Sequence, residues 1–179
     1  MRLLFLALAA TLLTGTASGS ETPISSYAGQ ELRTIKALSN DEVEGLLAGK
    51  GLGFAKSAEL NGYPGPAHVI ELASQLGLSK KQQEATQAIH QRMQTRARSL
   101  GEQLVREESQ LEQLFRQGNA SLSELDRILE TISNLQAELR GAHLAAHIEQ
   151  RHVLTTAQVV QYTHLRGYGA HQTGGHHRH

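Results

Sequence analysis

The sequence predicts an all-α protein built around one long antiparallel helical hairpin with short flanking helices. No proline occurs in residues 67–179, so that stretch lacks the strongest helix breaker. Apolar residues recur in steps of four and seven over 79–117, and again at helical spacing over 125–139, which marks one face of each helix. The Gly118-Asn119 pair leaves only a short turn between the two stripes, so the helices are expected to lie antiparallel.

Composition narrows the function classes before any motif is considered. The 179 residues carry 17 basic and 17 acidic side chains and only 4% aromatics, so neither a basic field nor a row of stacking rings favours nucleic acid. The chain has no cysteine, which excludes disulfides, thiolate zinc sites and a catalytic thiol. Ten histidines are the one excess.

The N-terminus is typical of a secretory signal peptide. Arg2 precedes an apolar run over 3–13, and a small polar run over 14–20 offers a cleavage site, so we assign 1–19 as the signal peptide. An apolar run of this length is too short to span a bilayer, so no stable membrane insertion is expected. In a Gram-negative bacterium the mature chain would reside in the periplasm. Residues 20–38 show no periodicity and are predicted to be an extended leader.

The helical domain is predicted to span 39–168. Ser39 caps an interrupted helix that four glycines weaken, and the breaker over 61–66 separates it from a short helix ending at Gly77. The first long helix follows over about 79–117, with a stripe of Ile89, Met93, Leu100, Leu104, Leu111 and Phe115.

Ser121 and Glu124 form a capping box for the second long helix, and Thr155 caps a final helix that Gly167 closes. Gly101 and Gly141 lie at similar numbers of residues from the turn, so in an antiparallel hairpin they are expected at about the same level along the two helices. We hypothesise that the two backbones cross closely there, with tolerated surface glycines as the alternative.

Two copies of a Leu-(Ser/Thr)-x-x-Gln pattern begin the first long helix and the last helix. In each copy the hydroxyl is expected to cap the helix, the glutamine to reach back, and the leucine to pack inward. The six motif residues are Leu78, Ser79, Gln82, Leu154, Thr155 and Gln158.

In these residues, over about 64–166, the chain resembles the Spy/CpxP family of periplasmic stress proteins, which has a twice-repeated Leu-Thr-x-x-Gln motif. Ser79 departs from the usual threonine but keeps the hydroxyl. The resemblance implies a bent hairpin that dimerises into a cradle. It also implies ATP-independent binding of unfolded or misfolded envelope proteins, or in some members the damping of a sensor kinase. A neighbouring branch, the heavy-metal resistor or metal-sensor proteins, uses the same hairpin to bind transition metals.

Charges along the first long helix are segregated, with a cationic first half and an acidic second half. A cationic and apolar face could hold clients, and a solvated face with ordinary helix pairs is the alternative. The candidate client-binding residues are Arg92, Arg96, Arg98 and Met93.

Histidines supply the candidate metal ligands. His143 and His147 lie four residues apart on one helix face, and His68 is a candidate third ligand for a Zn, Ni or Cu ion. Histidines held by buried hydrogen bonds or at a dimer seam are the alternative. Met93 is placed too far along the hairpin to join them, and His90 and His164 are expected at the surface. The tail over 169–179 is predicted to be flexible and a weak chelator through His171, His176, His177 and His179.

No motif of an enzyme is present. The 143–147 segment has the histidine spacing of a zincin, but alanine stands in place of the catalytic glutamate. The sequence therefore predicts an exported, non-enzymatic, homodimeric chaperone or stress adaptor with no required cofactor. The alternative is a periplasmic transition-metal sensor or resistance accessory protein.

Overall fold

The computed structural model describes residues 24–168, so the predicted signal peptide and the tail histidines lie outside the described residues. Residues up to Glu31 and residues from Leu32 onward form two separate units. In the first, the Ala28 N–H donates to the Ser25 carbonyl and the Gln30 N–H to the Tyr27 carbonyl. A 3₁₀ helix covers Gln30–Leu32. Residues 24–38 thus contain turns and a 3₁₀ helix, where an extended leader was predicted.

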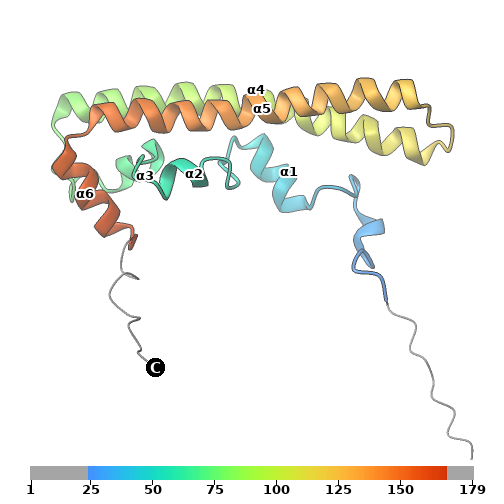
Figure 1. The fold of residues 1–179 in the computed structure, drawn as a ribbon, viewed down its shortest axis with the longest axis horizontal. Coiled ribbons are helices and arrows are strands. Elements are labelled where there is room, and N and C mark those ends of the chain that lie inside the picture. Colours follow the sequence, from blue (N-terminus) through green and yellow to red (C-terminus); the bar gives the residue numbers. More distant parts are fainter. Residues whose placement is uncertain (1–23, 169–179) are drawn as a thin grey trace, which may run out of the picture. The chain divides into compact units, whose positions relative to one another are not determined.

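The second unit confirms the all-α prediction and the long hairpin. Helices α4 (Lys80–Arg116) and α5 (Leu122–Val153) run antiparallel, joined at Gly118, whose φ of 70° suits glycine (Figure 1). Their facing stripes form the larger core with Leu100, Leu104, Ile132 and Leu139. One stripe residue was placed wrongly: Phe115 is 60% exposed, and its neighbour Leu114 takes the buried position.

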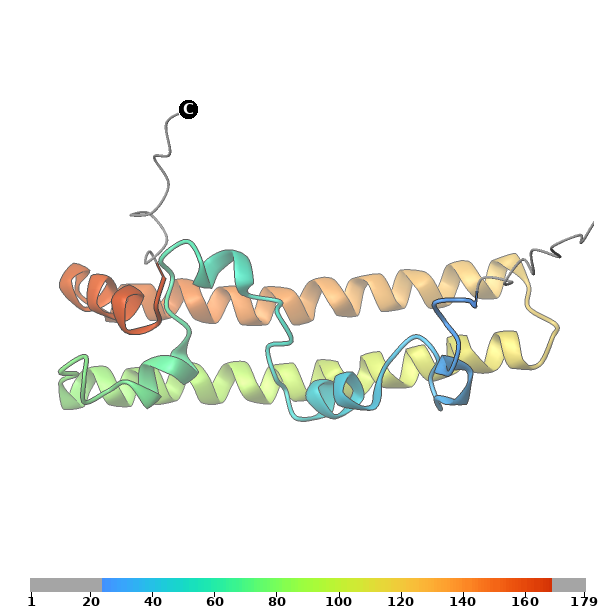
Figure 2. The same cartoon turned by 90° about the horizontal axis from the view of Figure 1, so that it is seen from below.

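Three short helices cover one side of the hairpin (Figures 1 and 2). They are α1 (Asn40–Leu47), α2 (Lys56–Glu59) and α3 (Pro66–Glu71), and turns continue from α3 to Gly77. Helix α1 lies along α4, whereas α2 lies along α5 (Figure 2). The predicted interruption of the first helix is therefore confirmed, and the gap between α1 and α2 is a glycine-rich loop over 48–55.

The predicted crossing of Gly101 with Gly141 is wrong. A Cβ at Gly101 would overlap the backbone carbonyl of Leu46, so this glycine admits α1 rather than the other arm of the hairpin. Gly141 is exposed, and among the described residues nothing outside the neighbouring backbone of its own helix lies within 4 Å of where its Cβ would be. The number of residues from the turn could not predict the contact of Gly101, because its partner comes from a separate helix, α1.

Both copies of the repeated motif form complete capping boxes, at Ser79 and at Thr155 before α6 (Thr156–Leu165). The two motif glutamines also meet: Gln82 Nε2 donates to Gln158 Oε1 at 2.8 Å. Each amide additionally donates to a backbone carbonyl next to the other motif, at Val153 or Leu76. The motif therefore joins the start of α4 to the start of α6. The leucines of both copies lie in the smaller core with Tyr162.

At α5 the capping prediction holds in part, since Ser121 accepts from the Glu124 N–H while the Glu124 carboxylate accepts from the serine hydroxyl. Within the described residues, no helix has the length and apolar character needed to cross a bilayer.

Candidate functional site

A cavity of about 310 Å³ lies between the hairpin and the segment that precedes it. Its walls come from the glycine-rich loop, the start of α3, and the inward faces of α4 and α5. Four imidazoles and one thioether line it: His68, His90, Met93, His143 and His147. We call this cavity the histidine pocket. Sequence reasoning missed two of its members, because Met93 and His90 were placed away from the other histidines and both line the same cavity.

His143 is the most buried of these side chains, with only 4% of its surface exposed. Its ring stacks on Phe54 with centroids 6.0 Å apart, and the Nε2 atom has no hydrogen-bond partner within residues 24–168. Burial, and to a smaller degree the charge of His147, lower the pKa of His143. The side chain is therefore a neutral imidazole at neutral pH, the form that binds metals.

His147 lies one helical turn further along α5 and is held by the turn that precedes α3. Its Nδ1 lies 2.7 Å from the carbonyl oxygen of Tyr63, to which a neutral ring donates. In a neutral ring, a hydrogen bond donated by Nδ1 leaves Nε2 as the nitrogen available to a metal ion, as in many metal-ligating histidines. Gly65 gives this ring its room, since a Cβ there would stand 2.9 Å from Cε1 of His147.

Glu59 also holds the turn that precedes α3. Its carboxylate accepts from the hydroxyls of Tyr162 at 2.5 Å and Tyr168 at 3.0 Å, and from the Gly65 N–H at 3.1 Å. Arg166 Nε lies 3.4 Å away as an ion pair without hydrogen-bond geometry. Burial, then the bond to Glu59, raises the pKa of Tyr162, so this phenol remains a donor.

The Glu59 cluster went unpredicted because its members are more than 100 residues apart in sequence. The one available signal was the breaker over 61–66, which was interpreted only as a boundary.

His68 borders the histidine pocket from α3, and its Nδ1 lies 3.0 Å from the Glu71 carboxylate, which accepts the hydrogen bond. It also lines a second cavity of about 410 Å³ with His147, Glu59 and Tyr168. Among residues 24–168, no three histidine, aspartate or glutamate side chains are placed to hold one metal ion. Met93 lies outside that set of residue types. The pocket thus contains possible metal ligands from several elements, but they are not arranged around one ion position.

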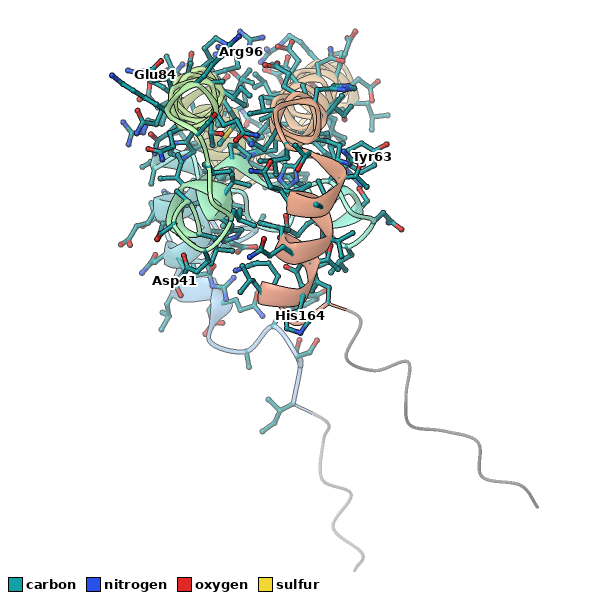
Figure 3. All side chains as sticks on the ribbon, turned by 90° about the vertical axis from the view of Figure 1, so that its left-hand side faces the viewer. Asp41, Tyr63, Glu84, Arg96 and His164 are labelled. Carbon is teal, nitrogen blue, oxygen red and sulfur yellow. The ribbon has the colours of Figure 1, made fainter. Side chains whose placement is uncertain are left out.

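The candidate client-binding arginines are all engaged within the chain. Arg92 pairs with Glu149 at 2.6 Å and Arg96 pairs with Glu138, both across the outer side of the hairpin. Arg98 donates to the Ala48 carbonyl at 3.3 Å and so helps to hold the loop after α1. Figure 3 shows Arg96 on α4, remote from His164, which lies at the far end of α6. Acids of α5 therefore neutralise two of these three arginines, Arg92 and Arg96.

Comparisons of this chain with protein-family models, with curated proteins and with solved structures find no match.

Proposed function

We propose that this protein binds a transition-metal ion in the histidine pocket and acts as an exported metal sensor or resistance accessory protein. The observation that carries the proposal is the buried Nε2 of His143, which has no partner in the part of the chain that the structure describes and belongs to a side chain that lines the cavity. A buried polar atom without a partner is costly, and a bound ion would remove that cost.

The donors favour a late first-row metal. Imidazoles suit zinc, copper and nickel, and the thioether of Met93 adds a preference for a soft ion such as Cu(I). His143 and His147 lie on the same face of α5, and Met93 and His90 face them from α4. Side-chain rotation within the cavity would be needed to bring three donors to one ion. The Nδ1 contact of His147 with Tyr63 is an outer-shell interaction that would orient this ligand.

Calorimetric titration of Cu(I), Zn²⁺ and Ni²⁺ tests the proposal. The four tail histidines are first replaced by serine, so that chelation there does not mask the pocket. We expect submicromolar binding of at least one ion, lost in His143→Ala/His147→Ala and kept in the matched control His164→Ala, since His164 is exposed on α6. Equal binding by the double variant and the control would refute the proposal.

Client binding is the second candidate function, and exposed apolar side chains beside the hairpin turn favour it. Phe115 is 60% and Leu122 79% exposed, although both are large and apolar. Exposed apolar surface of this kind often marks a protein-interaction site. In an aggregation-suppression assay, Phe115→Ser/Leu122→Ser should lose protection that His143→Ala/His147→Ala retains. If the histidine variant lost protection and the Phe115→Ser/Leu122→Ser variant kept it, client binding at this surface would be refuted.

A further inference from the structure

We infer that a groove between α2 and α5 binds a medium-chain fatty acid, with the alkyl chain along α5 and the carboxylate at Arg151. This inference is independent of the proposed metal site. The groove is open and has a volume of about 620 Å³, which is in the range of small-molecule sites. One wall comes from α5, and the other comes from α2 and the turn that follows it. We call it the amphiphile groove.

Most of the amphiphile groove is apolar. Leu144 and Ile148 line it from α5, and Ala58 and Tyr63 line it from the other side. Figure 3 shows Tyr63 beside α5, on the side of that helix away from α4. Ile148 is 51% and Tyr63 41% exposed, so two large side chains that border one hollow remain in contact with water. An apolar ligand would be stabilised by removing both surfaces from water.

One end of the amphiphile groove is cationic, because Arg151 and His152 line it there. None of the ion pairs among residues 24–168 includes Arg151. Two nearby acids are already engaged, since Glu149 pairs with Arg92 and Glu59 accepts hydrogen bonds in its own cluster. The charge at this end therefore favours an anionic group on the ligand, and a guanidinium binds a carboxylate in a bidentate manner.

The length and the walls of the groove favour a fatty acid over other amphiphiles. From Leu144 to Arg151 the helix rises about 10 Å, which suits one alkyl chain of medium length. An extended peptide would need backbone groups to pair with, but the backbone of α5 is bonded within its own helix. A single arginine beside a single apolar trough fits one carboxylate and one chain.

Calorimetric titration of decanoate into the full mature chain, below the concentration at which decanoate forms micelles, tests the inference. We expect a dissociation constant below about 100 μM, which rises up to about fourfold for each methylene removed in octanoate and hexanoate. The neutral 1-octanol should bind about tenfold more weakly than octanoate, because it lacks the charge that Arg151 recognises.

Variants separate the two ends of the groove. Arg151→Gln should weaken octanoate about tenfold and leave 1-octanol unchanged, whereas Ile148→Ser should weaken both ligands. Arg140→Gln is the matched control, since Arg140 is exposed on the same helix and does not line the groove. Methyl resonances of Leu144 and Ile148 should shift on addition of decanoate.

Three results would overturn the inference. One is the absence of decanoate binding at about 1 mM. Another is an equal affinity of the parent and Arg151→Gln for octanoate, which would assign the groove to a neutral apolar partner such as a client segment or a second copy. The last is a set of methyl shifts confined to residues beside Phe115 and Leu122, which would place the fatty acid at the hairpin turn.

Discussion

The two ends of the hairpin differ in how many parts of the chain meet there. At the base, where α4 begins and α5 ends, α2, α3 and α6 also gather, and their contacts link residues 60 to 110 positions apart. At the tip, the two arms meet each other and the segment over 32–38, through Lys36 with Glu112 and Arg116 with the Thr34 carbonyl. Polar groups buried by several elements therefore concentrate at the base, and the candidate site lies toward it.

The largest expected effect is at the base, in Glu59→Ala. Removal of this carboxylate leaves the Gly65 N–H, the phenols of Tyr162 and Tyr168, and Arg166 without their acceptor. Unfolding in urea should show a loss of about 3 kcal/mol, because several buried donors lose their partner together.

The matched control is Glu124→Ala, which removes an exposed carboxylate beside the tip and should cost below about 1 kcal/mol. Equal losses for the two variants would contradict the contrast between base and tip.

The next largest effect concerns the two glycines within the long helices, because their substitution by alanine should change the free energy of unfolding with opposite signs. Gly101→Ala would force α1 away from α4 and destabilise the fold by about 2 kcal/mol. Gly141→Ala should stabilise the monomer by about 1 kcal/mol, since no described residue outside the neighbouring backbone of its own helix lies within 4 Å of the new methyl group. Thermal unfolding of both variants at low protein concentration measures the pair, and a shared sign would refute these assignments.

Low pH should destabilise the end of the hairpin where α4 begins and α5 ends, through protonation of His143. Burial lowers its pKa in the folded protein, so at mildly acidic pH the unfolded chain binds the extra proton more readily. Its contribution to stability is complete above the ordinary histidine pKa of about 6.5 and declines as the pH falls through that value. Urea midpoints recorded from pH 8 to 5 should decline less in His143→Phe than in the parent. Parallel curves would show that another group dominates.

The smallest effect is expected in the tip half of α4, at Glu108. Burial raises the pKa of this carboxyl, so its ionised form opposes folding once the pH rises above the unfolded value. Glu108→Gln should therefore raise stability at pH 7 by less than about 1 kcal/mol and have no such benefit near pH 4. Denaturation at the two pH values tests this, and a loss at pH 7 would indicate an unrecognised partner for the carboxylate.

Local patterns predicted the fold well. Ser79 and Thr155 cap their helices as the repeated motif required, and the range of about 79–117 predicted for the first long helix agrees with Lys80–Arg116 to within one residue at each end. These features depend on neighbours three to seven positions apart. The pairing of Gln82 with Gln158 and the contact of Gly101 with Leu46 depend on how separate helices pack, and local periodicity carries no such information.

The candidate site was predicted only in part for the same reason. His143 and His147 were found because one helix carries both. Met93 and His90 were misplaced, because the cavity that they line from α4 is completed by α3 and the glycine-rich loop. Glu59 was not predicted, since its partners Tyr162 and Tyr168 lie near the other end of the sequence and the breaker over 61–66 was interpreted only as a boundary.

Anomalous X-ray scattering from crystals grown with a copper salt under reducing conditions is the most direct test of a metal site in the histidine pocket. We expect a peak in the pocket, bonded to Nε2 of His143 and near Met93, and absent in His143→Ala. Peaks confined to surface histidines such as His164 or to the C-terminal tail would contradict it.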